Sequence, residues 1–153
     1  MIRGLFILLF SCFFLLMGAQ EVKKQSVPLI PYPVNLIEGE GQFVFTEKTI
    51  VAWEDEEMEV LAEDFVSLFT EAAGFTPKLK KGKKGDVRIV KDENLQEEGY
   101  VLEVTLDKIW IKAAGNKGAF YALQTLRQLL PAAIESNAYH EGVEWSVPVV
   151  SVT

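Results

Sequence analysis

The chain has 153 residues with 15 basic and 22 acidic side chains, which gives a formal net charge of −7. A negative chain of this composition argues against nucleic acid as a partner, because the phosphate backbone would be repelled. The length suits one domain with one hydrophobic core and leaves no room for a second.

Residues 1–19 have the layout of a secretory signal peptide. Arg3 is the only charge, an apolar run extends from Leu5 to Met17, and small residues follow at Gly18 and Ala19. The run is shorter than the ~20 apolar residues of a spanning helix, so no stable membrane span is expected. The pattern predicts an exported protein, periplasmic or extracellular, with cleavage near Ala19.

Cys12 is the only cysteine of the chain. Residues 9–12 loosely resemble a bacterial lipobox, but the apolar residues 13–17 continue beyond the cysteine, which would close the apolar region in a lipobox. We therefore expect no lipoprotein attachment through Cys12. Because cleavage removes it, residues 20–153 can form neither a disulfide nor a thiolate metal site, and their stability must depend on packing.

The first half of the mature chain predicts two strands and a helix. Residues 20–27 form a polar leader, and the prolines that follow favour an extended segment. Residues 42–45 and 49–53 have strand composition, and the short turn between them predicts an antiparallel pair. Asp55 can cap a helix that begins with acidic residues and ends at Gly74. The predicted buried stripe of this helix is Met58, Leu61, Ala62, Phe65, Leu68, Phe69 and Ala72.

The second half predicts a strand, a hairpin and a second helix. Residues 78–85 are rich in glycine and lysine and predict a solvated hairpin loop, after which residues 86–90 form a short strand. An acidic loop at residues 92–99 leads into a hairpin made of residues 101–105 and 109–112. Together these elements predict an α+β domain over residues 28–144, in which two helices pack on one face of a mainly antiparallel sheet.

The segment Gly115–Pro131 joins the hairpin to the second helix. Asn116 is the predicted N-cap and Pro131 the stop. Gly115 and Gly118 fit a tight strand-to-helix turn better than a phosphate-binding loop, because the third glycine and the Lys-Ser/Thr pair are missing. Helical spacing places one apolar stripe on the sheet, consisting of Ala119, Ala122, Leu123, Leu126 and Leu130.

Two groups of residues resemble the non-catalytic N-terminal domain of family 20 glycoside hydrolases, which are exo-acting β-N-acetylhexosaminidases. One comprises residues 98–100, 111–115 and 118–131, and the other comprises residues 29–36 and 41–45. Together they cover roughly residues 28–153. The resemblance implies the α+β architecture and a role as an accessory domain.

In that family the chemistry resides in a (β/α)₈ barrel that follows this domain. An adjacent Asp-Glu pair acts there, and the 2-acetamido group of the sugar is the nucleophile. The resemblance implies that this chain holds no catalytic, substrate-binding, cofactor-binding or metal-binding residue, and that the barrel is its partner and the route to the glycan. Residues 145–153 are predicted to begin the linker or first strand toward the barrel, so we expect a fragment of a longer enzyme. The alternative is a free-standing domain with another role.

Charged residues offer two candidate sites with simpler explanations. The acidic run 54–57 and Glu59 could be a carboxylate site, but acids are expected at a helix start, and Glu63 and Asp64 lie off the apolar stripe. The lysine cluster could bind an anionic glycan or membrane surface, but a solvated hairpin loop explains it more economically. The cluster consists of the lysines at 78, 80, 81, 83 and 84.

His140 and the aromatic residues complete the candidates. His140 is the only histidine and has no triad partner and no set of convergent metal ligands, so an exposed loop position is expected. A secreted carbohydrate-binding or protein-interaction module is the alternative function, and it would use Trp110, Tyr121 or Trp145. Phe120 beside Tyr121 suits a core or a domain interface better than a sugar platform.

Related accessory domains precede the barrels of family 84 N-acetylglucosaminidases and some α-glucuronidases, which gives a third possibility. The pattern of residues 124–126 after Phe120 and Tyr121 is closer to family 20. Whether the chain is part of an enzyme therefore depends on the missing barrel.

Overall fold

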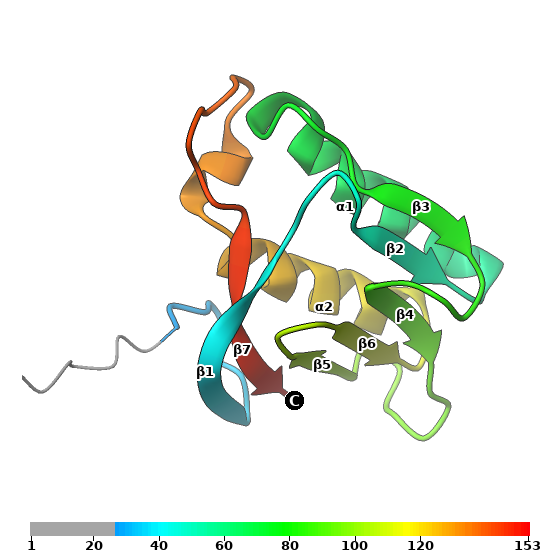
Figure 1. The fold of residues 1–153 in the computed structure, drawn as a ribbon. Coiled ribbons are helices and arrows are strands. Elements are labelled where there is room, and N and C mark those ends of the chain that lie inside the picture. Colours follow the sequence, from blue (N-terminus) through cyan, green and yellow to red (C-terminus); the bar gives the residue numbers. More distant parts are fainter. Residues whose placement is uncertain (1–26) are drawn as a thin grey trace, which may run out of the picture.

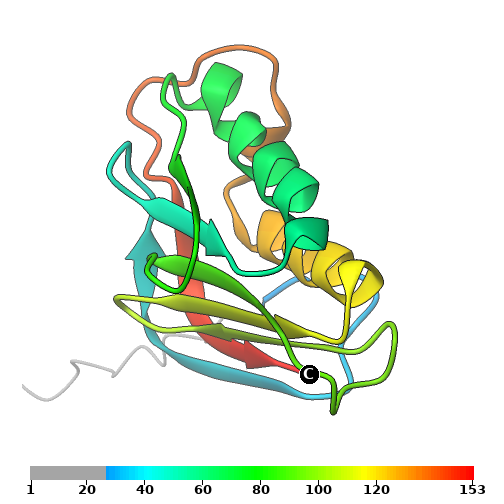
Figure 2. The ribbon, with the colours of Figure 1, turned by 90° about the vertical axis from the view of Figure 1, so that its right-hand side faces the viewer.

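Seven strands form one mixed sheet, and two helices cover one of its faces (Figures 1 and 2). The computed structural model describes residues 27–153. The predicted signal peptide, Cys12 and most of the polar leader lie outside the described residues. The α+β class predicted from the sequence is confirmed, with both helices on the same side of the sheet.

The elements follow one another along the chain as two strands, a helix, four strands, a helix and a final strand. The strands are β1 (Leu36–Val44), β2 (Ile50–Trp53), β3 (Lys78–Lys81), β4 (Val87–Lys91), β5 (Tyr100–Val104), β6 (Ile109–Ala113) and β7 (Ser146–Val152). The helices are α1 (Glu59–Ala72) and α2 (Asn116–Leu129), with short 3₁₀ turns at η1 (Glu56–Met58) and η2 (Ala132–Glu135).

The strand order is β1-β7-β5-β6-β4-β2-β3. The pairs β1–β7, β7–β5 and β5–β6 are antiparallel. The strands β6, β4, β2 and β3 are parallel to one another. The sheet is therefore more evenly mixed than the mainly antiparallel sheet expected from the sequence. The parallel half arises because α1 carries the chain back between β2 and β3, as helical crossovers do in parallel sheets.

The predicted antiparallel pairing of residues 42–45 with residues 49–53 is wrong. β1 pairs with β7 at one edge of the sheet, and β2 lies between β3 and β4 near the other edge. The aromatic side chains decide this separation. The Phe45 ring lies 5.0 Å from the Phe69 ring of α1, so burial under the helix outweighs the local turn preference.

The apolar run of residues 146–152, predicted to begin a linker, is an interior strand of the domain. β7 pairs with β1 on one side and β5 on the other, and Val147, Val150 and Val152 are buried. A strand paired on both sides and covered by helices needs an apolar sequence. Residues 146–152 are therefore part of the same sheet as residues 36–113.

The predicted loop at residues 78–85 contains the edge strand β3. Its four residues are exposed, and its lysines make an edge that resists pairing with other chains. The next residues cross back over β2 to begin β4 (Figure 1). A Cβ atom on Gly85 would lie 2.6 Å from the Cβ of Ala52, so small residues are needed where the segment crosses the strand.

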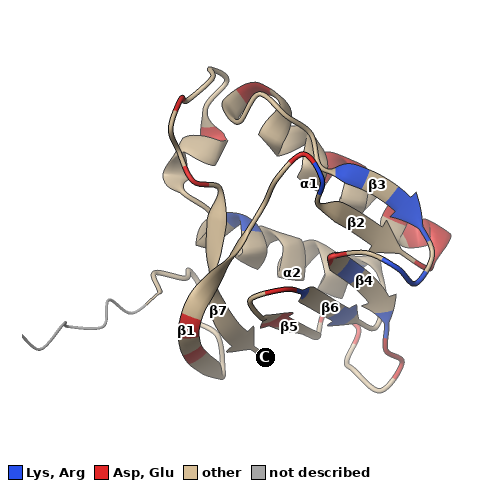
Figure 3. Ribbon diagram, viewed as in Figure 1, with Lys and Arg blue, Asp and Glu red and all other residues tan. Residues whose placement is uncertain are grey.

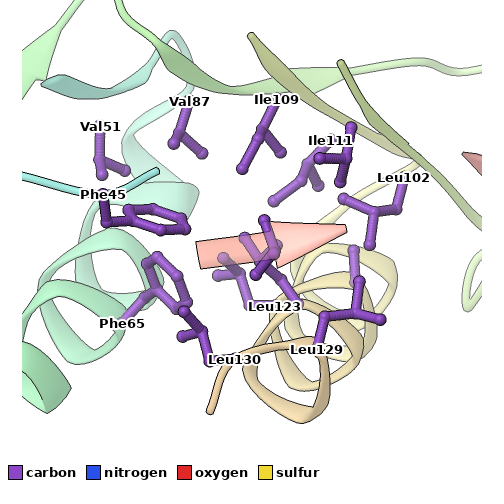
Figure 4. Close-up of a cluster of buried hydrophobic side chains, with 14 of the residues drawn as sticks. Phe45, Val51, Phe65, Val87, Leu102, Ile109, Ile111, Leu123, Leu129 and Leu130 are labelled. Carbon is purple, nitrogen blue, oxygen red and sulfur yellow. The ribbon is translucent and has the colours of Figure 1, made fainter. Parts of the chain in front are cut away.

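One hydrophobic core fills the space between the sheet and the helices (Figure 4). The predicted stripe of α2 is buried throughout, as are Met58, Phe65 and Phe69 of the first helical segment. Leu61 and Leu68, which were predicted to be buried with them, are only partly buried. Both lie at the boundary between α1 and α2, where the helices leave a groove.

The helix ends agree with the sequence in part. The Asp55 side chain accepts a hydrogen bond from the Glu57 amide at 3.1 Å, and Gly74 has the positive φ of +71° expected after a helix. The predicted N-cap Asn116 is instead the first helical residue, and Gly115 is the cap without a side-chain hydrogen bond. One residue is within the usual uncertainty of a helix boundary.

The two glycines before α2 have different roles. Gly115 has extended backbone with φ −173°, and a Cβ atom there would meet nothing within 4 Å. A Cβ atom on Gly118 would lie 2.3 Å from the backbone oxygen of Gly99. The close approach of α2 to the turn before β5, rather than a tight turn into the helix, therefore requires glycine at 118.

We predict that Gly118→Ala destabilises the domain by about 1–3 kcal/mol, because helix and turn must move apart. Gly115→Ala is the matched control and should cost less, about 0.5–1 kcal/mol, since Ala is a poorer cap than Gly but meets no other atom. Urea unfolding of residues 20–153 followed by circular dichroism measures both changes. Equal effects of the two substitutions would contradict the close-approach argument.

Candidate functional site

A groove runs between α1 and α2, and we call it the helix groove. It consists of adjoining hollows that share lining residues. Leu61 and Phe120 line both the hollow at the start of the helices and the central hollow. Leu68 and Arg127 line both the central hollow and the hollow at the opposite end. The hollow at the start of the helices has a volume of about 540 Å³, and the central hollow about 300 Å³. Leu61 and Leu68 thus form part of its floor.

The end of the helix groove near the helix N-termini has exposed apolar side chains flanked by Glu56, Glu57 and Lys117. Val60 is 62% exposed, Phe120 45% and Tyr121 43%. The Phe120 and Tyr121 rings lie 5.7 Å apart at 66° to each other. Rings at this angle do not form one flat platform for a sugar, whereas they suit an irregular protein surface.

The opposite end of the helix groove is polar and carries an ion pair. Arg127 donates from Nε to Glu135 Oε1 at 2.6 Å and from Nη2 to the other carboxylate oxygen. The hydrogen bond from Arg127 lowers the pKa of Glu135, and the same bond raises the pKa of Arg127. Both ends of the groove therefore carry charges, whereas large exposed apolar side chains gather at the end near the helix N-termini.

The acidic run and the lysine cluster are partners of each other. Lys81 of β3 donates to Glu56 at 2.6 Å, and the Lys83 ammonium lies 3.7 Å from Glu54. Figure 3 shows basic positions of β3 close to acidic positions at the start of α1. The hydrogen bond from Lys81 lowers the pKa of Glu56, and the bond to Glu56 raises the pKa of Lys81. The carboxylates are thus counter-charges of the neighbouring strand edge, which is a structural use rather than a paired-carboxylate site. Glu63 and Asp64 are exposed, as predicted.

A stacked cluster at Trp110 was not found from the sequence. The Arg88 guanidinium lies 4.2 Å from the centre of the Trp110 ring and donates from Nη2 to Glu54 at 2.9 Å. Arg88 and Trp110 are opposite each other in the parallel strands β4 and β6. Because the guanidinium covers one face of the indole, Trp110 is not an open platform for a sugar.

The remaining candidate residues have structural positions. The His140 amide donates to the Ala72 carbonyl at 2.9 Å, so the loop covers the end of α1, and His140 is half-buried rather than exposed. Trp145 is 5% exposed and packs against Phe69. Of the aromatic residues proposed for glycan binding, only Tyr121 is freely exposed. Within residues 27–153 no cluster of three His, Cys, Asp or Glu side chains could hold a metal ion.

Comparison with known proteins identifies the family. Residues 26–153 match glycosyl hydrolase family 20, domain 2. The chain belongs to this family. Family 20 is thereby favoured over family 84 and the α-glucuronidases, as the residues 124–126 indicated. Within residues 27–153, neither helix is both long and apolar enough to cross a membrane.

Relatives of the chain are bacterial hexosaminidases. A β-hexosaminidase of Porphyromonas gingivalis is 29% identical over 131 residues, which cover 78% of this chain and 17% of the relative. The N-acetyl-β-hexosaminidase of Streptomyces plicatus, solved with Thio-NAglucal, is 27% identical with a TM-score of 0.75. The family 20 β-N-acetylhexosaminidase of Streptomyces coelicolor is 28% identical with the same TM-score. Each Streptomyces structure covers 81% of this chain, which spans only 25% of theirs.

We predict that Arg88→Met lowers the free energy of unfolding by about 1–2 kcal/mol, because the substitution removes the cation–π contact and the bond to Glu54 but keeps the aliphatic stem. Lys84→Met is the control, since Lys84 is exposed and has no ion pair within residues 27–153. It should change stability by less than about 0.5 kcal/mol. Urea titrations at low and high salt measure both, and indistinguishable midpoints would contradict the structural role of the cluster.

Proposed function

We propose that the chain is the N-terminal accessory domain of an exported β-N-acetylhexosaminidase. The full-length enzyme removes terminal N-acetylglucosamine or N-acetylgalactosamine from glycans by substrate-assisted hydrolysis in a (β/α)₈ barrel. The family match, the names of the relatives and the small share of their length that this chain spans support the proposal. The signal-peptide pattern of residues 1–19 supports export.

We infer that the domain supports the barrel and takes no part in the chemistry. The helix groove is the observation that carries this inference, because it exposes Val60, Phe120 and Tyr121 together on the layer that covers the core. Contiguous apolar surface of this kind is typical of interfaces, and domains of one chain commonly bury ~600–1,500 Å² against each other. The occupant we propose is the barrel itself.

The position of the chain end supports the same partner. Val152 is opposite Leu102 in the sheet, next to the turn that contacts Gly118 at the start of α2. Figure 2 shows the C-terminal residue at the end of the sheet where both helices begin. A barrel that follows residue 153 would therefore emerge at the end of the sheet where both helices begin.

Isolated residues 20–153 should show no turnover of a chromogenic N-acetylglucosaminide, because no charged or nucleophilic cluster in residues 27–153 provides the required acid and nucleophile stabiliser. Activity that a substitution within this domain abolishes would overturn the proposal. Calorimetric titration with chitooligosaccharides should give no binding heat. Saturable binding that Tyr121→Ala removes would favour the carbohydrate-binding module instead.

A hybrid enzyme tests the docking role. Residues 27–153 replace the matching domain of the Streptomyces coelicolor enzyme, and the melting temperature of its barrel is compared with that of the barrel alone. The hybrid barrel should melt higher by several degrees, since burial of apolar surface stabilises it. Val60→Ser with Phe120→Ser should remove most of that gain.

The controls for the hybrid separate docking from folding. The same two substitutions should cost the isolated domain no more than about 1–2 kcal/mol, because Val60 is 62% and Phe120 45% exposed. Lys84→Ser, at an exposed residue that does not line the helix groove, should leave the hybrid unchanged. A hybrid that melts like the barrel alone would reject the accessory role.

A further inference from the structure

The segment before β1 carries a row of exposed apolar side chains. Ile30 is 80% exposed, Tyr32 69% and Val34 91%. They alternate with Pro31 and Pro33. Single exposed apolar residues are ordinary, but three within five residues form a local apolar cluster on a segment whose backbone bends at 30, 31 and 34. We call residues 30–34 the proline ridge.

The proline ridge is fastened to the domain at both ends. The Ile30 amide donates to Gln128 Oε1 at 2.9 Å, and Gln128 Nε2 donates back to the Ile30 carbonyl at 3.1 Å. At the other end, Asn35 and Thr153 exchange two backbone hydrogen bonds of 3.0 and 3.1 Å. The neighbouring Leu29 is 5% exposed and anchors the segment in the core.

A fastened apolar segment is well suited to recognition. Two prolines and two clamps already restrict the backbone, so little conformational entropy remains to be lost when a partner binds. The core does not explain the row, because its three side chains point to solvent. Their exposure therefore calls for a partner outside residues 27–153.

The clamp to Thr153 is the observation that favours one partner. Any chain that continues from Thr153 begins within hydrogen-bonding distance of Asn35, one residue from the ridge. We propose that the proline ridge is a second docking surface for the catalytic barrel, separate from the helix groove, and that Gln128 is the positioning residue that holds it. This inference rests on the proposed function. It commits to an apolar surface of the barrel rather than to a second copy of the domain or a glycan.

The hybrid enzyme described above tests the ridge with its own variants. Tyr32→Ser with Val34→Ser removes apolar surface, and Gln128→Leu removes the clamp while leaving Tyr32 and Val34 in place. Both should lose a large part of the gain in barrel melting temperature. Leu106→Ser is the matched control, because Leu106 is 60% exposed but lies in the turn between β5 and β6, at the other end of β5 from Val152. It should retain the full gain.

The isolated domain provides the second measurement. Tyr32→Ser with Val34→Ser should leave its melting temperature unchanged and leave it monomeric by analytical ultracentrifugation. An equal fall in the isolated domain would mean that the ridge supports the fold and would overturn the inference. Self-association of the original domain that this double variant abolishes would assign the ridge to a second copy.

The outcomes distinguish the inference from the proposed function. A hybrid stabilised equally with and without the ridge residues overturns the ridge and leaves the accessory role intact. A hybrid that gains nothing even with the original residues overturns both. Loss of the gain in the ridge variants alone, with Leu106→Ser unaffected, supports the ridge as a barrel contact.

Discussion

The position of β7 between β1 and β5 is the constraint on which the rest of the domain depends. The last strand of the chain joins the first strand to the hairpin, so neither part of the sheet is complete without it. Its buried valines lie between these neighbours. Trp145, the residue before β7, packs against Phe69 of α1. Because these contacts are distant in sequence, the loop-closure entropy must be overcome before they form, which favours slow and cooperative folding.

Local signals in the sequence predicted the parts of the fold that local interactions determine. The stripe of α2, the hairpin of β5 and β6, and the Asp55 cap follow from spacing and side-chain chemistry within a few residues. The partner of β1 could not be found in this way. Nothing near residues 42–45 shows that Phe45 will pack under α1 or that its amide will bond to the Trp145 carbonyl.

The candidate site was predicted in the same uneven manner. The acidic run and the lysines could each be explained alone, but their pairing depends on the parallel alignment of β2 with β3 and β4. Residues at the edge of a predicted stripe gave the best available signal for the helix groove. Leu61 and Leu68 have the right spacing for burial but are only partly buried. Val60, Phe120 and Tyr121 lie on parts of the helices that do not face the sheet, and they are exposed.

The two edges of the sheet and its open face each have features that disfavour contact with another protein surface. The lysine-rich strand β3 protects one sheet edge, and a register shift between Glu38 and Gln42 interrupts the other. On the open face of the sheet, Arg88 covers Trp110 and is itself paired with Glu54. Besides exposed residues elsewhere in residues 27–153, such as Ile37, Leu106 and Tyr139, exposed apolar side chains gather where α1 meets α2 and along the proline ridge. A domain that satisfies its edges and its open face but leaves these two surfaces apolar is built to be covered there.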